Sequence, residues 1–247
     1  MGQAVGFGFL GGFAMLLGAF IAFRTRLTEG VVGRVMAFGA GTLVCAVTLE
    51  LTTEAFSEAR GGAFILGLLA GSGAYYLGDA IIERRLGTID LDAEPGDPDA
   101  PSMGNALKVV VGSVLDGVPE SAAIGLSIAA GGTVSVALVV AVFVSNVPEG
   151  LMPSLDMEAA GVSRRRIYAM WFGLALVCTA SSVFGYAVLG ELPHPVDAFA
   201  EAFAAGAILT MLVMVFLVEA VQRAGRAVGI WTILGYALAT VLTVVQH

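Results

Sequence analysis

The 247-residue chain is 57% hydrophobic and only 13% charged, with a mean hydropathy of +0.90. Soluble domains carry about a quarter charged residues, so this composition excludes an ordinary water-soluble domain. The formal net charge of -8 argues against nucleic acid as a partner.

Apolar runs long enough to cross a bilayer follow one another along nearly the whole chain. A helix needs about 20 apolar residues to cross about 30 Å of hydrocarbon. We therefore predict an all-α, polytopic membrane protein: a single transmembrane domain over residues 1–247, surrounded by the lipid bilayer. The eight predicted transmembrane helices are about 3–23, 32–55, 62–82, 106–130, 134–154, 168–189, 198–221 and 227–246. One long linker, about 87–103, is acidic and contains three prolines, so we expect it to be solvated and disordered.

The basic residues lie almost entirely on one set of loops. The loops after the first, third, fifth and seventh spans hold all but one of the 12 Lys and Arg residues, and Arg60 is alone on the other side. Positive residues mark the cytoplasmic side, so we expect both termini to lie outside the cytoplasm, with the protein in the plasma (inner) membrane. No basic residue precedes the first apolar stretch, so we expect this span to be retained rather than cleaved as a signal peptide.

Two sets of segments resemble each other within the chain. The segment AFGAG at Ala37 recurs as AFAAG at Ala202, and VPE at Val118 recurs at Val147. In each pair the first copy runs outward through the membrane and the second runs inward. We therefore predict a 3+2+3 inverted-repeat arrangement, a construction that many secondary transporters use for alternating access.

The fourth and fifth spans carry acidic residues at membrane depth, where insertion is costly and such residues usually mark a pathway. Asp116 and Glu120 are four residues apart, which places them on one helix face, and Glu149 lies on the fifth span. With two neighbouring polar residues they form the predicted metal site: Asp116, Glu120, Ser145, Asn146 and Glu149.

Each of the two glutamates directly follows a proline. Pro119 and Pro148 cannot donate a backbone hydrogen bond, so the carbonyls of Leu115 and Val144 lose their helix partners. Freed carbonyls at membrane depth need a neighbour or a cavity, and clustered oxygen ligands suit hard divalent cations. We therefore favour a cation site over the alternative, two protonated glutamates that are hydrogen-bonded for packing.

These motifs resemble those of the ZIP (Zrt-, Irt-like) metal transporters. The similar segments are VLDGVPESAAIGLSIAAGG, VFVSNVPEGLMPSL, AFGAGTLVCAVTLELTTEAF and AFAAGAILTMLVMVFLVEA. The resemblance implies an eight-span importer of zinc, iron, manganese or related divalent ions, with a one- or two-metal site between the fourth and fifth helices. It also implies a homodimer. The small-residue face of Gly67, Gly71 and Gly78 fits close contacts either between protomers or within one.

The chain departs from the ZIP pattern at the metal site. Family members usually carry His-Asn where this chain has Asp116-Gly117, and a His or Gln followed by an acid where it has Ser145-Asn146. A family glutamate in the sixth span is also missing, and Ser181 or Ser182 stands near its place. The resemblance thus implies a first metal site of Asp116, Glu120, Ser145 and Glu149, with Asn146 as the remnant of an absent or weak second site.

No histidine lies in an apolar run, since His194 is predicted in an outer loop and His247 ends the chain. The loss of imidazole shifts ligand preference from zinc toward oxygen-preferring ions such as Mn²⁺, Fe²⁺ or Mg²⁺, whereas the family resemblance alone implies zinc. Divalent ions of the Zn, Mn or Fe class are therefore the expected substrates, Cd²⁺ is the expected surrogate, and no organic cofactor is expected.

Other embedded polar residues fit a cation pathway. They are Ser113 and Ser182 beside the site, Glu50 and Glu54 near the outer end of the second span, and Glu219 near the inner end of the seventh. Carboxylates that simply reach the membrane interface explain the last three equally well.

The sequence as a whole predicts a divalent metal cation transporter that moves metal toward the cytoplasm by alternating access. The alternative is a non-transporting, ZIP-like protein that binds or senses metal. We do not expect an enzyme, because neither a helical His-Glu-x-x-His motif nor a Ser/His pair occurs at membrane depth.

Overall fold

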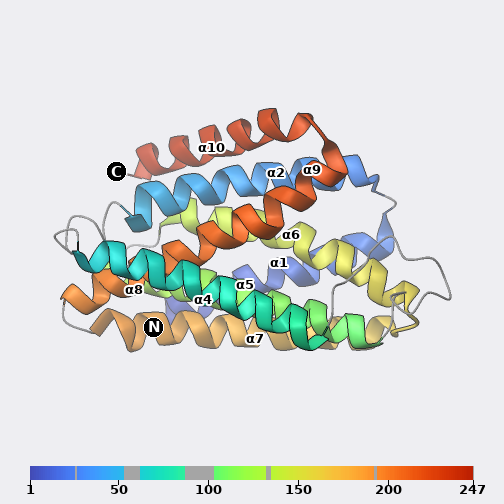
Figure 1. Ribbon diagram of the computed structural model, residues 1–247, viewed down its shortest axis with the longest axis horizontal. Helices are drawn as coiled ribbons and strands as arrows, with labels where there is room; N and C mark the ends of the chain where they lie inside the picture. The colour runs from blue at the N-terminus through green and yellow to red at the C-terminus, as the bar shows by residue number, and fades with distance from the viewer. Residues whose placement is uncertain (26, 53–61, 87–102, 132–134, 192–193, 247) are drawn as a thin grey trace.

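The computed structural model describes residues 1–25, 27–52, 62–86, 103–131, 135–191 and 194–246, and within these ranges it is helical without strands. The helices lie side by side in one bundle, and both chain ends lie at the same end of it (Figure 1). In chain order they are α1 (Gly2–Arg24), α2 (Glu29–Ala46), η1 (Val47–Leu51), α4 (Gly62–Leu86), α5 (Met103–Gly131), α6 (Val136–Ala159), α7 (Arg164–Ala187), η2 (Leu189–Glu191), α8 (His194–Met211), η3 (Leu212–Phe216), α9 (Leu217–Ala224) and α10 (Ala227–Gln246). The predicted all-α class is confirmed for the described part of the chain.

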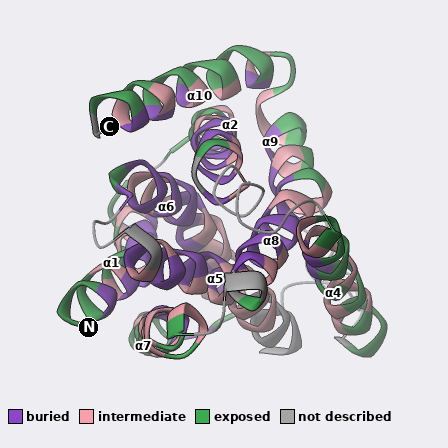
Figure 2. Ribbon diagram, turned by 90° about the vertical axis from the view of Figure 1, so that its left-hand side faces the viewer, coloured by how far each residue is buried: buried purple, intermediate pink, exposed green. Residues whose placement is uncertain are grey.

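Seven helical segments in the described ranges are long and apolar enough to cross a membrane. α5 is not among them, although its 29 residues provide ample length. Asp116 and Glu120 interrupt its apolar sequence and lower its hydropathy. α5 lies inside the bundle, against α1, α7 and α8 (Figure 2), so its neighbours shield these carboxylates from lipid. The predicted span that is least suited to lipid is therefore the one that carries the candidate site.

Helix boundaries differ from the prediction mainly near the charged loops. α6 continues to Ala159 instead of ending near 154, α7 begins at Arg164 instead of near 168, and His194 begins α8 instead of lying in a loop. Charged residues end an apolar run, but Glu and Arg are good helix formers, so the helices continue through them. The predicted acidic linker at 87–103 lies outside the described residues, except for Met103, where α5 begins.

α4 and α10 lie on the outside of the bundle, and many of their residues are exposed (Figure 2). The exposed residues include large apolar ones. Leu66 and Leu69 of α4, and Ile230 and Ile233 of α10, are each about two-thirds exposed. Large exposed apolar patches are rare on soluble monomers, whereas acyl chains cover such surfaces in a bilayer. The surface of the bundle therefore agrees with an integral membrane protein.

Glycines allow four helix pairs to approach closely: α1 and α6 at Gly18, α5 and α7 at Gly125, α2 and α10 at Gly41, and α4 and α8 at Gly206. A Cβ atom at any of these positions would collide with the backbone of the partner helix. Small residues at helix contacts are the usual packing mode in membranes. The predicted small-residue face of α4 is used within the protomer, because Gly67 and Gly71 face α8 and Gly78 faces Leu115 of α5.

Two helices widen into a single π-helical turn, η1 at the end of α2 and η3 between α8 and α9. In a π turn the backbone hydrogen bonds depart from the regular i to i−4 pattern of the α-helix. Near η1, threonine hydroxyls donate hydrogen bonds to nearby backbone carbonyls. Thr48 Oγ1 donates to the carbonyl of Val44 at 2.6 Å, and Thr52 Oγ1 donates to the carbonyl of Thr48 at 2.6 Å. π turns are frequent at functional sites, and residues of η3 line the pocket described next.

Candidate functional site

A cavity of about 670 Å³ lies between α4, α5, α6 and the segment from α8 to α9. It occupies the half of the bundle toward which α4 ends and α7 begins, where Arg84, Arg85 and Arg164 lie. Its rim reaches the surface at the exposed Glu83. Its lining includes six acidic residues: Asp79, Glu83, Asp116, Glu149, Asp156 and Glu219. The result is an acidic cavity inside a largely apolar bundle.

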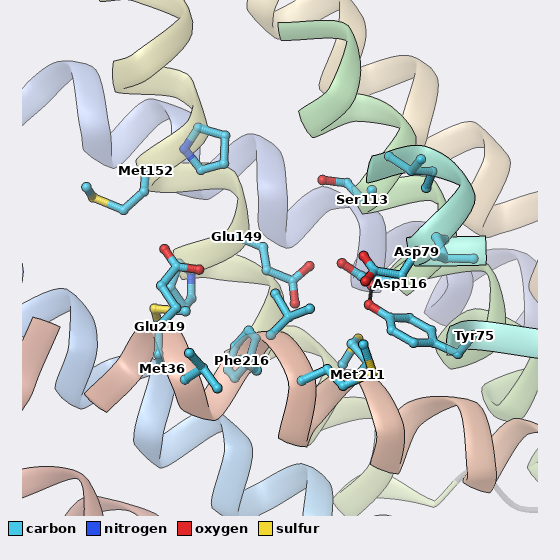
Figure 3. Close-up of a pocket in the computed structure, with 18 of the residues that line it drawn as sticks. Met36, Tyr75, Asp79, Ser113, Asp116, Glu149, Met152, Met211, Phe216 and Glu219 are labelled. Atoms are coloured by element: carbon cyan, nitrogen blue, oxygen red, sulfur yellow. Dashed lines mark hydrogen bonds between the residues drawn. The ribbon is translucent and has the colours of Figure 1, made fainter. Parts of the chain in front are cut away.

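Asp116 of α5 and Glu149 of α6 turn their carboxyl groups toward each other in this cavity (Figure 3). Both carboxyl oxygens of Glu149 are buried and have no hydrogen-bond partner within the described part of the chain. Asp116 accepts one hydrogen bond at Oδ1, from the hydroxyl of Tyr75 at 2.6 Å. Buried carboxylates are costly unless they are paired or bind a metal. Two facing carboxyl groups with free oxygens match the ligand preference of hard divalent cations.

Glu120 lies one helical turn beyond Asp116 on α5 and does not line the cavity. Its side chain is 0% exposed, and neither of its carboxyl oxygens has a hydrogen-bond partner among the described residues. It lies within electrostatic range of both Asp116 and Glu149. Asp116 and Glu149 thus lie on the cavity wall, whereas Glu120 is buried outside the lining, one turn along α5 from Asp116.

The acidic residues are spread along the cavity rather than gathered at one point. Among the described residues, no three His, Cys, Asp or Glu side chains are close enough together to hold a metal ion. Local backbone oxygens extend the set of candidate ligands, because Pro119, Pro148 and Pro153 lie inside α5 and α6 and each removes a backbone donor. Pro153 deprives the carbonyl of Glu149 itself of its usual helix partner. Backbone and side-chain oxygens thus occur together at Glu149.

Ser145 and Asn146 belong to the predicted ligand set but do not line the cavity. Ser145 is buried, and its hydroxyl donates to the carbonyl of Val142 at 3.0 Å. Asn146 Nδ2 donates to the carbonyl of Gly11 in α1 at 3.1 Å, while its Oδ1 has no partner in the described ranges. Asn146 therefore joins α6 to α1, whereas the Ser145 hydroxyl bonds within α6 itself.

The predicted pathway residues divide into three groups. Ser113 and Glu219 line the cavity, and Glu219 is paired with Arg223, one turn later on α9, at 2.8 Å. Ser182 is fully buried on α7 away from the lining, and its hydroxyl has no hydrogen-bond partner among the described residues. Glu50 lies in η1, and Glu54 lies outside the described residues.

Four polar residues of the cavity were not predicted: Tyr75, Asp79, Glu83 and Asp156. Helical spacing in the sequence could have identified all four as residues of one site. Tyr75, Asp79 and Glu83 follow at intervals of four on α4, and Asp156 lies seven residues after Glu149 on α6, so each set shares a helix face. The nearby arginines obscured this signal, because acidic residues beside basic ones at the end of a span look like an ordinary membrane boundary.

Models of known protein families give no match to this chain, and no curated protein matches it. The resemblance described above therefore rests on the sequence motifs themselves.

Proposed function

We propose that this protein is a divalent metal cation transporter of the ZIP class that moves metal toward the cytoplasm by alternating access. The observation that carries the proposal is the pair of facing carboxyl groups, Asp116 and Glu149, in an acidic cavity inside an apolar bundle. The cavity lies in the half of the bundle with the basic residues, the half that the positive-inside rule assigns to the cytoplasm. The cavity then opens toward the cytoplasm, the side on which metal is released in the proposed transport.

Two structural correspondences support the 3+2+3 inverted repeat. The offset that carries Ala37 onto Ala202 also carries η1 (Val47–Leu51) onto η3 (Leu212–Phe216). It likewise carries Gly41, which packs on α10, onto Gly206, which packs on α4. Equivalent π turns and equivalent close contacts are expected if the first three and last three spans have one fold in opposite orientations. Inverted repeats of this kind provide the two access states of many transporters.

The central pair α5 and α6 carries the three carboxyl groups at the site. A cation that enters from outside displaces protons or waters at Asp116, Glu120 and Glu149. It is released inside when α5 and α6 rock against the remaining spans. The chain contains no Walker A sequence for ATP, so transport is passive or coupled to an ion gradient.

A non-transporting, ZIP-like protein that binds or senses metal is the second candidate. Two observations favour it: Asp116 and Ser145 stand where the family usually has other ligands, and no three ligand side chains converge in the described part of the chain. This candidate predicts metal binding without flux.

Metal flux into proteoliposomes that contain the purified protein and a divalent-ion indicator tests the proposal. We expect saturable flux for at least one of Mn²⁺, Zn²⁺, Fe²⁺ and Cd²⁺, with Mg²⁺ as a further ion. Glu120→Gln and Glu149→Gln each remove an anionic oxygen, so each is expected to lower flux at least about tenfold while the protein stays folded. The matched control is Glu158→Gln, the same substitution on the helix of Glu149, at a partly exposed position outside the cavity where the carboxylate pairs with Arg164.

Flux at the wild-type level in Glu149→Gln would contradict the site assignment. Metal binding by folded wild-type protein without flux of any ion would favour the second candidate instead.

A further inference from the structure

The hydrogen bond between Tyr75 and Asp116 joins two different parts of the bundle. Tyr75 belongs to α4, which packs chiefly against α8, whereas Asp116 belongs to α5 of the central pair. The phenol hydroxyl donates to Asp116 Oδ1 at 2.6 Å, and Tyr75 is only 3% exposed. Figure 3 shows this bond on the cavity wall, beside the gap between Asp116 and Glu149.

α4 and α5 touch each other over a much smaller area than α4 and α8 do. Near this bond, Gly78 of α4 lies against the side chain of Leu115, the residue before Asp116. The neighbouring Tyr76 points away from the cavity and is 56% exposed. Among the described residues, the hydrogen bond from Tyr75 is the one that joins the Asp116 carboxyl group to α4.

The hydroxyl of Tyr75 and a bound metal ion would both interact with the negative charge of the Asp116 carboxylate, so each interaction weakens the other. Hydrogen bonds to an ionised acceptor are stronger than those to a neutral one. A bound divalent cation draws charge from the carboxylate, so the bond from Tyr75 is weaker when metal is present than when it is not. A contact that stabilises the metal-free state more than the metal-bound state lowers metal affinity.

We propose that Tyr75 is a positioning residue that promotes metal release, because it holds the metal-free Asp116 carboxylate against α4 while the cavity is open. This inference rests on the proposed transport function. Tyr75 acts through Asp116 and is not itself a metal ligand. The opposite role, orienting Asp116 for metal binding, would make the same residue increase affinity.

Tyr75→Phe tests the proposal, because it removes the hydroxyl and keeps the buried ring. The first readout is the Kd for Cd²⁺ and Mn²⁺ of the purified full-length protein, measured by calorimetry. We expect the Kd to fall roughly fivefold, the effect of one hydrogen bond of ordinary net strength. In proteoliposomes KM and kcat should fall together, because metal is held more tightly and leaves more slowly. Tyr76→Phe is the matched control and should change neither value.

A second measurement reports on the cavity without any metal. Ser113 is only 7% exposed but lines the cavity, whereas the two native cysteines, Cys45 and Cys178, are buried outside the cavity lining. In metal-free protein in detergent, a maleimide should therefore label Ser113→Cys faster than the parent. Adding Tyr75→Phe should slow this labelling about threefold or more, as one lost hydrogen bond shifts the population away from the open form.

A weaker affinity in Tyr75→Phe would overturn the release role and assign Tyr75 to metal binding. Unchanged affinity and unchanged labelling would show that the bond has no role in transport. Both results presuppose that the wild-type protein binds metal. If the wild-type protein binds no metal, the proposed function itself is wrong. If it binds metal but Tyr75→Phe does not behave as expected, only the role of Tyr75 is wrong.

Discussion

At the scale of single residues, two kinds of buried polar side chain are found in the central helices. Ser154 is fully satisfied, since its hydroxyl donates to the carbonyl of Gly150 at 2.5 Å and accepts from Trp171 Nε1 at 2.8 Å. Glu120 and Glu149 have carboxyl oxygens without hydrogen-bond partners among the described residues. Native proteins satisfy nearly all buried polar groups, so exceptions need an explanation. The first kind stabilises the fold, and we attribute the second kind to function.

Ser154→Ala tests the structural kind. It leaves the buried indole N–H of Trp171 without its partner, so the free energy of unfolding should fall by about 1–2 kcal/mol. Thermal unfolding in detergent measures the change. The control is Thr25→Ala, which removes a hydroxyl bond to the carbonyl of Ile21 at an exposed helix end and should have little effect. Equal losses in the two variants would contradict this interpretation.

The residues of the candidate site were predictable to different degrees. The proline-glutamate motifs and the acidic residues at membrane depth single out Asp116 and Glu149, and these two do face each other. Ser145 lies four residues before Glu149, a spacing that places two residues on one face of a regular helix, but its side chain does not line the cavity. Pro148 lies between them, and prolines kink helices, so regular helical spacing is unreliable there. The role of Tyr75 depends on a contact between α4 and α5 that no local pattern encodes.

At the scale of helices, close contacts through glycine hold the bundle together. Gly41 of α2 and Gly206 of α8 occupy equivalent positions under the proposed repeat, and each faces the backbone of its partner, at Thr232 of α10 and Leu68 of α4. Without a hydrophobic force between helices in lipid, such close packing is a main source of stability.

Gly41→Ala and Gly206→Ala should therefore destabilise the protein by similar amounts, about 1–3 kcal/mol each, because the added methyl group forces two backbones apart. Matched controls lie on the partner helices. Gly229 of α10 and Gly73 of α4 have open space where a Cβ would be, so Gly229→Ala and Gly73→Ala should be neutral or stabilising by up to about 1 kcal/mol. Unfolding in detergent measures all four. If the two control variants lost as much stability, any glycine-to-alanine change in these helices would be destabilising, and the packing argument would be contradicted.

Within the described residues, the order of the long helices followed from the apolar runs, but their details did not. Hydropathy ends where charge begins, whereas α6 and α7 extend through charged residues. The turns η1 and η3 were not predicted, because a π turn differs from an α-helix by one residue in its hydrogen-bond ladder and leaves no distinct periodicity. The recurrence at Ala37 and Ala202 nevertheless pointed to their equivalent positions.

At the scale of the whole molecule, an apolar surface surrounds an acidic interior. α4 and α10 carry large exposed apolar residues outside, and six acidic residues line one cavity within. Low-dielectric walls around charges of one sign focus their field and concentrate counter-ions. The apolar surface explains why composition alone indicated a membrane protein. The cavity could not be predicted in this way, because it depends on how α4, α5, α6 and α9 are placed relative to one another.

The central claim is that Asp116 and Glu149 together hold a divalent cation, and anomalous X-ray scattering from crystals soaked in Cd²⁺ or Mn²⁺ tests it most directly. We predict an anomalous peak between the two carboxyl groups, within bonding distance of at least one oxygen from each, and its loss in Glu149→Gln. Glu158→Gln should keep the peak. A well-ordered crystal with bound metal elsewhere and none between Asp116 and Glu149 would contradict the account.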